Sequence, residues 1–204
     1  HEQHRQALIT IDDGHTDCQL LAPLFAQLPE LQPMLFVTAA LLAGDRRPLP
    51  LTALYSWCAT HGRTLAQAAA ELGIDRAGMK CLPEEAQRKR LASAGVSLDP
   101  EDEVMLAPTQ IKQLLSSGWL IGSHGPEHCD LRQMEPGALA EQLLITRRAL
   151  MAFGGTPWLA WPEGRNNQTL LELGRAAGFA LQFGLDTEPG CTPGPELILR
   201  SVWT

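Results

Sequence analysis

The fold is decided by the stretch Ala7-Leu8-Ile9-Thr10-Ile11-Asp12-Asp13-Gly14, an apolar run that ends in two carboxylates and a glycine. Such a run is typical of a strand buried on both faces, as in a parallel sheet covered by helices. Asp12 and Asp13 would then lie at the C-terminal end of the strand, where α/β folds place their sites. A metal ion or a shared proton would offset the repulsion between the two carboxylates. The alternative is a turn that merely ends the strand.

Strand-like and helix-like segments alternate along most of the chain. Further strands are expected over 34–38 (with 39–42 continuing the apolar run), 119–122, 158–161, 179–185 and 197–203, and helices over 18–27, 108–115, 136–153 and 167–177. About six strands alternating with helices predict a parallel α/β architecture, either a barrel or an open sheet. Neither G-x-G-x-x-G nor a P-loop occurs, so the common nucleotide-binding motifs are absent.

Residues 44–107 have a different pattern, with expected helices over 51–60, 64–72 and 83–94 and no strand pattern. Proline and acidic residues at 83–85 suit a first helical turn. We interpret this segment as a helical insertion within a single domain that spans residues 1–204. It either forms a wall or cap over the site or packs against the outside of the barrel as filler.

Composition and charge exclude several classes of function. The 204 residues carry a net charge of -7, which gives no electrostatic footprint for nucleic acid or an anionic membrane and fits a neutral or cationic ligand. No stretch approaches the ~20 apolar residues of a transmembrane helix.

The cysteines and the N-terminus bear on the compartment. The five cysteines are odd in number and contain no C-x-x-C pair, so no disulfide framework is expected and free thiols favour the cytoplasm. No signal peptide is recognisable. The chain begins only a few residues before its first strand, which leaves room for an upstream segment that was removed.

His124 and His128 form an H-x-x-x-H pair directly after the expected strand 119–122. In a parallel barrel, the loops that follow the strands converge on one face, so this pair is expected near Asp12 and Asp13. Two imidazoles and one carboxylate make a three-ligand site with open positions, as in catalytic zinc centres. The second aspartate would be placed to accept a proton from water. The alternative is two surface histidines in a loop.

These residues carry a family resemblance. Thr10–Gly14 resembles the T-F-D-D-G motif of polysaccharide deacetylases, the NodB-homology group of carbohydrate esterases, and Ser123–Leu131 resembles their second, H-[ST]-x-x-H motif. Trp161-Pro162-Glu163-Gly164 resembles their third motif. The resemblance implies a distorted (β/α)₇ barrel and a divalent metal, mainly Zn²⁺, with Co²⁺, Ni²⁺ or Mn²⁺ as alternatives. It also implies that the partner is an acetylated glycan or sugar conjugate, from which an N- or O-acetyl group is hydrolysed.

The resemblance also implies roles for single residues. Asp13, His124 and His128 would bind the metal, and Asp12 would be the catalytic base. The backbone N–H of Glu163, after Pro162, would help to stabilise the oxyanion. Trp161, Pro162 and Glu163 are the candidates for substrate contact.

The chain departs from the family pattern at several positions. Gly125 replaces a Ser or Thr, Glu163 stands where an aromatic residue is usual, and no arginine precedes the third motif. Arg165 and Arg200 are candidates for the partner of the base. No histidine follows His128, so the usual general acid is missing.

His15 is a candidate to replace the missing general acid. Two alternatives to the deacetylase remain open: a carbohydrate-binding pseudoenzyme without catalysis, and a hydrolase of another amide, such as a cyclic ureide, on the same fold.

Overall fold

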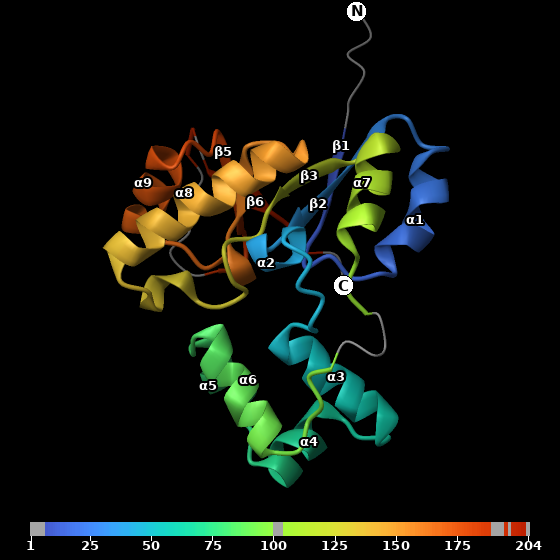
Figure 1. Ribbon diagram of the computed structural model, residues 1–204, viewed down its shortest axis with the longest axis vertical. Coiled ribbons are helices and arrows are strands. Elements are labelled where there is room, and N and C mark those ends of the chain that lie inside the picture. Colours follow the sequence, from blue (N-terminus) through green and yellow to red (C-terminus); the bar gives the residue numbers. More distant parts are fainter. Residues whose placement is uncertain (1–6, 100–103, 189–193, 196, 203–204) are drawn as a thin grey trace, which may run out of the picture.

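The computed structural model describes residues 7–99, 104–188, 194–195 and 197–202. Within these residues, parallel strands form one six-stranded sheet whose spatial order follows the sequence. The strands are β1 (Ala7–Ile11), β2 (Leu31–Val37), β3 (Leu120–Ser123), β4 (Trp158–Ala160), β5 (Leu181–Leu185) and β6 (Leu197–Arg200). The sheet curls like part of a barrel (Figure 1). The expected parallel α/β architecture is confirmed, although the described residues form six strands where the resemblance implied seven.

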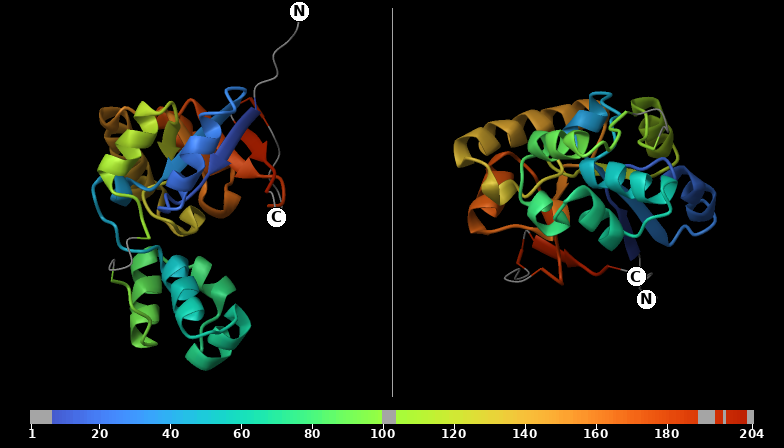
Figure 2. Two further views of the ribbon diagram at one scale, coloured as in Figure 1. Left: turned by 90° about the vertical axis from the view of Figure 1, so that its right-hand side faces the viewer. Right: turned by 90° about the horizontal axis from the view of Figure 1, so that it is seen from below.

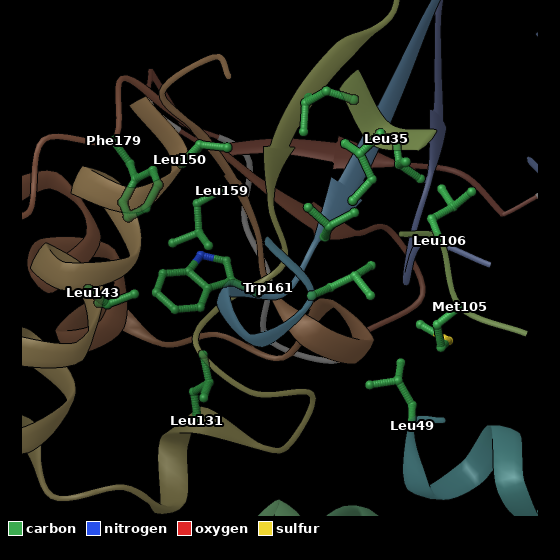
Figure 3. Packing of buried hydrophobic residues seen from close by; sticks show 14 of the residues in the cluster. Leu35, Leu49, Met105, Leu106, Leu131, Leu143, Leu150, Leu159, Trp161 and Phe179 are labelled. Carbon is green, nitrogen blue, oxygen red and sulfur yellow. The ribbon is translucent and has the colours of Figure 1, made fainter. Parts of the chain in front are cut away.

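Helices cover the convex face of this sheet. They are α1 (Cys18–Phe25), α2 (Ala39–Leu42), α7 (Pro108–Ser116), α8 (Pro136–Phe153) and α9 (Gln168–Ala176). The main core lies between them and the sheet, where Trp161 and Leu159 pack with Leu143 and Leu150 of α8 (Figure 3). Phe36 and Phe183 belong to a smaller cluster on the opposite face, because successive strand side chains point to opposite sides.

One local expectation was wrong. β1 is not buried on both faces: Ala7 and Leu8 are exposed, because β1 is an edge strand that pairs only with β2 in the described part of the chain. The apolar run continues beyond β2, as expected, into residues 39–42. They form the short helix α2, as expected of alanine and leucine, which are strong helix formers.

The segment between α2 and α7 is helical, as predicted. It contains α3 (Pro50–Thr60), α4 (Leu65–Leu72), α5 (Arg76–Lys80) and α6 (Glu84–Ser93), of which α5 was not expected. Thr64 and Gln67 form a capping box at the start of α4. A separate apolar cluster holds these helices together, including Leu54, Ala68 and Leu91. Figures 1 and 2 show them as a layer beyond the C-terminal ends of the strands.

Two findings agree with the composition. No helix in the described ranges is long and apolar enough to cross a membrane. Cys18, Cys58, Cys81 and Cys129 are free thiols, and Cys191 lies outside the described residues.

Candidate active site

Asp12 and Asp13 lie in a tight turn that begins where β1 ends. Asp13 has a φ of 75° and Gly14 a φ of 84°, in the left-handed region that aspartate tolerates and glycine adopts freely. A Cβ at Gly14 would lie 2.5 Å from Cδ2 of Leu41. Glycine is therefore required here both by backbone conformation and by the close packing of α2.

The two histidines reach the same turn from the loop after β3. His124 is almost completely buried, and its Nδ1 lies 2.9 Å from the carbonyl oxygen of Ala160 in β4, to which it can donate. This contact leaves Nε2 free to face Asp13. His128 lies four residues further along an irregular loop, so the pair does not share a helical turn. Asp13 Oδ1 lies 3.6 Å from His124 Nε2 and 3.2 Å from His128 Nε2.

The donor set fits a divalent metal ion. One ligand atom each from Asp13, His124 and His128 lie within 4.8 Å of one another. Tetrahedral coordination with bonds of about 2.0 Å places ligand atoms roughly 3.3 Å apart. Asp13 Oδ1 is buried and has no hydrogen-bond partner among the described residues, an arrangement that a cation would satisfy. Although burial raises the pKa of Asp13, its neighbours His15, His128 and His124 lower it well below its ordinary value.

Asp12 is held by an arginine from the far end of the chain. Arg200, the last residue of β6, binds both carboxylate oxygens of Asp12 with N–O distances of 2.7 and 2.9 Å. Burial raises the pKa of Asp12, but His124 and Arg200 lower it below its ordinary value. Of the two candidate partners of Asp12, Arg200 takes this position. Arg165 instead binds Asp130, at 3.2 Å.

The third motif is only partly at the site. Trp161 is fully buried in the core, where its indole N–H donates to Oε1 of Gln182 at 3.1 Å. The expectation that Trp161 contacts substrate is therefore wrong for its side chain, because its indole packs against α8 (Figure 3). Pro162 is buried as well, at the start of the short 3₁₀ helix η3 (Pro162–Gly164). Glu163 has a φ of 56° and reaches the pocket next to the cluster.

A pocket of about 400 Å³ opens at the metal-ligand cluster. Asp13, His15, His128 and Glu163 line it on the barrel side, and the insertion side includes Leu51, Thr52, Tyr55, Ser56 and Arg76. The insertion also bonds to the motif loops. Lys80 of α5 forms an ion pair with Glu163, and Oε2 of Glu84 in α6 accepts the His128 backbone N–H at 3.0 Å. The insertion is thus a wall of the site, and the filler interpretation was wrong.

A sequence profile described as polysaccharide deacetylase matches residues 79–181, half of the chain. The chain belongs to the polysaccharide deacetylase family. The match includes the histidine pair and the third motif, and the fold brings Asp12 and Asp13, from outside the matched range, to the same site. A search of curated proteins found no match.

Solved deacetylase structures share the fold. IcaB from Ammonifex degensii is 18% identical with a TM-score of 0.55, over 97% of this chain and 67% of that one. The BpsB deacetylase domain from Bordetella bronchiseptica is 15% identical with a TM-score of 0.56, and the match covers 95% of this chain and 69% of that one. PplD from Streptococcus pyogenes, solved with acetate, is 15% identical with a TM-score of 0.50, and the match covers 86% of this chain and 54% of that one. The chain thus spans between about half and two thirds of the length of these structures.

In these 204 residues no histidine follows His128, whereas the polysaccharide deacetylase pattern has a late one. His15 is the described histidine closest to the ligand cluster besides the pair itself, with Nε2 lying 3.8 Å from Asp13 Oδ2 and 3.4 Å from Thr52 Oγ1. The nearby carboxylate of Asp13 raises the pKa of His15. Its position on the pocket wall is compatible with the predicted role, which stays a prediction.

Sequence reasoning missed the insertion residues at the site. Lys80 and Glu84 lie in helices whose local sequence contains no motif. The only local signal was the acidic pair at 84–85 after Pro83, which indicates a helix start and not a contact with a histidine loop.

Proposed function

We propose that this chain is a divalent-metal-dependent hydrolase that removes an acetyl group from an N- or O-acetylated sugar or polysaccharide. One spatial arrangement of side chains carries the proposal. Three metal-compatible ligand atoms and the arginine-held carboxylate of Asp12 meet beside a pocket, in a member of the polysaccharide deacetylase family.

The proposed site residues divide into a metal-holding set and a proton-handling set. Asp13, His124 and His128 would hold the ion, mainly Zn²⁺ with Co²⁺, Ni²⁺ or Mn²⁺ as alternatives, which, when bound, would act as a Lewis acid on the acetyl carbonyl and on water. Asp12 lies with Oδ2 3.8 Å from His124 Nε2, next to this cluster. Its lowered pKa keeps it ionised at neutral pH, so it can accept the proton of the attacking water.

The remaining roles are supported by position on the pocket. The Glu163 backbone N–H is proposed to donate to the oxyanion, by analogy with the family. His15 is proposed to return a proton to the leaving amine or hydroxyl, because it lines the pocket beside Asp13. Acetate and the free sugar amine or hydroxyl are the products.

The decisive experiment measures acetate release from a panel of N- and O-acetylated oligosaccharides, with metal analysis of the same preparation. We expect release from at least one sugar, loss of release in Asp12→Asn, and release retained in the matched control Asp99→Asn, in the insertion. Metal-loaded protein that releases no acetate from any glycan would contradict the deacetylase.

A second candidate is a carbohydrate-binding pseudoenzyme, favoured by the absence of a histidine after His128 within these 204 residues. It predicts glycan binding without acetate release, and with no loss of binding in Asp12→Asn. Turnover of a non-sugar amide, such as a cyclic ureide, in the same screen would favour the third alternative.

A further inference from the structure

The insertion side of the pocket carries a cation and an aromatic ring that the proposed chemistry does not use. Arg76 is the first residue of α5 and Tyr55 lies in α3, and both line the pocket that contains Asp13 and His128. The Arg76 guanidinium carbon lies 5.7 Å from the centroid of the Tyr55 ring, in the range of a cation–π contact. Tyr55 is 42% exposed although it is a large aromatic residue.

Arg76 has no carboxylate partner among the described residues, where no acidic group lies within ion-pair distance of its guanidinium. The adjacent Asp75 carboxylate instead accepts the backbone N–H groups of Ala77 and Gly78, at 3.1 and 2.9 Å. Lys80, the other cation of α5, already has Glu163 as its partner. The charge of Arg76 is therefore available to a ligand in the pocket.

We infer that the substrate carries an anionic group, a carboxylate or a phosphate, on or next to the acetylated sugar, and that Arg76 binds this group. The planar guanidinium matches two oxygens of either anion. Tyr55 restricts where the guanidinium can lie, which lowers the entropic cost of anion binding. A pocket of about 400 Å³ has the size of ordinary small-ligand sites. The acetylated-sugar part of this inference rests on the proposed function.

This inference differs from what the net charge indicated. A net charge of -7 fits a neutral or cationic ligand. Recognition, however, depends on the charges that line the pocket, and fields fall off within about 10 Å at moderate salt. Among the described insertion residues that line the pocket, Arg76 is the charged one, and Glu163 on the barrel side is already paired with Lys80.

The test measures binding by calorimetry in the Asp12→Asn background, so that turnover does not interfere. The ligands are a neutral N-acetylglucosamine oligomer and two matched oligomers, one with a uronate as the neighbouring sugar and one with a phosphate. We expect about tenfold tighter binding of one anionic oligomer, and the two arms distinguish carboxylate from phosphate. Arg76→Gln should remove this preference without changing the Kd of the neutral oligomer, and Arg76→Lys should keep part of it.

Three further variants separate the role of Arg76 from a general effect of charge. Lys89→Gln removes one positive charge from an exposed position of the same insertion and should leave the preference intact. Tyr55→Leu should reduce the preference, while Tyr55→Phe should keep it. Equal binding of neutral and anionic oligomers, or a preference that survives Arg76→Gln, would overturn the inference.

Acetate release is scored separately with the unmodified protein. If no acetylated glycan releases acetate but the Arg76-dependent preference is present, the proposed deacetylase fails and the anion subsite stands. If acetate is released and no anionic oligomer is preferred, the proposed deacetylase stands and the anion subsite fails.

Discussion

Arg200 binds both carboxylate oxygens of Asp12 across 188 positions of sequence, with N–O distances of 2.7 and 2.9 Å. The same guanidinium lies 3.1 Å from Thr10 Oγ1 and 5.3 Å from the centroid of the Phe36 ring. The last described strand thereby fixes the orientation and lowers the pKa of the residue that follows the first strand. This contact sets the working state of the proposed base.

Replacing Arg200 with glutamine should lower kcat by about 10- to 100-fold with a smaller change in KM, because Asp12 loses its orientation and not its substrate contacts. The pKa of Asp12 should rise when the positive charge is removed, since that charge favours the ionised carboxylate. The acidic limb of the pH–rate profile should therefore move to higher pH. Arg200→Lys, which keeps the charge but not the two-oxygen contact, should shift the limb less. A change in KM alone would contradict the assignment.

The insertion should control metal affinity through Glu84. Its Oε1 binds Arg88 at 2.5 Å and its Oε2 accepts the backbone N–H of His128, so it holds the ligand loop against α6. Glu84→Ala should weaken metal binding by about 10- to 100-fold, as do other losses of groups that support ligands. Competition of the loaded protein with a chromogenic chelator measures the affinity. Glu85→Ala, one residue further and exposed, is the matched control; equal losses in both variants would refute the role of Glu84.

Metal binding should stabilise the folded protein, because unfolding separates the three ligands. Added Zn²⁺ or Co²⁺ at about 100 times Kd should contribute about 2.7 kcal/mol to stability and raise Tm by several degrees. A chelator should reverse the rise. His128→Ala should abolish it, whereas His61→Ala, on the exposed end of α3, should leave it unchanged. A metal-induced rise that persists in His128→Ala would exclude this ligand set.

Two Asp-x-Arg pairs of the same spacing allow a test of burial. Asp130 binds Arg132 at 2.8 and 2.7 Å and is nearly fully buried, whereas Asp45 binds Arg47 in an exposed loop. Asp130→Asn should lower the free energy of unfolding by about 2 kcal/mol at pH 7, since it removes the buried negative charge that Arg132 and Arg165 share. Asp45→Asn should cost about 0.5 kcal/mol. Denaturant titration measures both.

The cost at Asp130 should depend on pH. Burial raises the pKa of this carboxyl, but Arg132 lowers it below its ordinary value. A carboxyl with a lowered pKa in the folded state stabilises the protein above its unfolded pKa and loses that contribution as the pH falls through the folded value. The difference between Asp130→Asn and the original protein should therefore be full at pH 7 and shrink below about pH 4. A difference that is constant from pH 7 to pH 3 would contradict this explanation.

The sequence alone determined the strand–helix alternation and the set of candidate metal ligands. Apolar periodicity and turn residues are local properties, and parallel strands bring the residues that follow them to one edge. The histidine pair and the two aspartates could therefore be placed together from the residue order alone, whereas the choice of Asp13 as the ligand was implied by the family resemblance. In the structure, the insertion contains a fourth helix that was not expected, and the ends of several elements differ by a few residues from the expected ones. These details depend on packing that periodicity does not encode.

Only the tertiary structure decided which other residues complete the site. Arg165 and Arg200 were equal candidates by sequence, and the sheet order brings Arg200 to Asp12 while Arg165 binds Asp130. Trp161 lies within a motif, yet the strand's alternation turns its indole into the core. Lys80, Glu84 and Arg76 belong to no motif, because their roles depend on where the insertion docks. The turn Asp12-Asp13-Gly14 was thus predictable as a site, but its partners come from long-range contacts that no local pattern specifies.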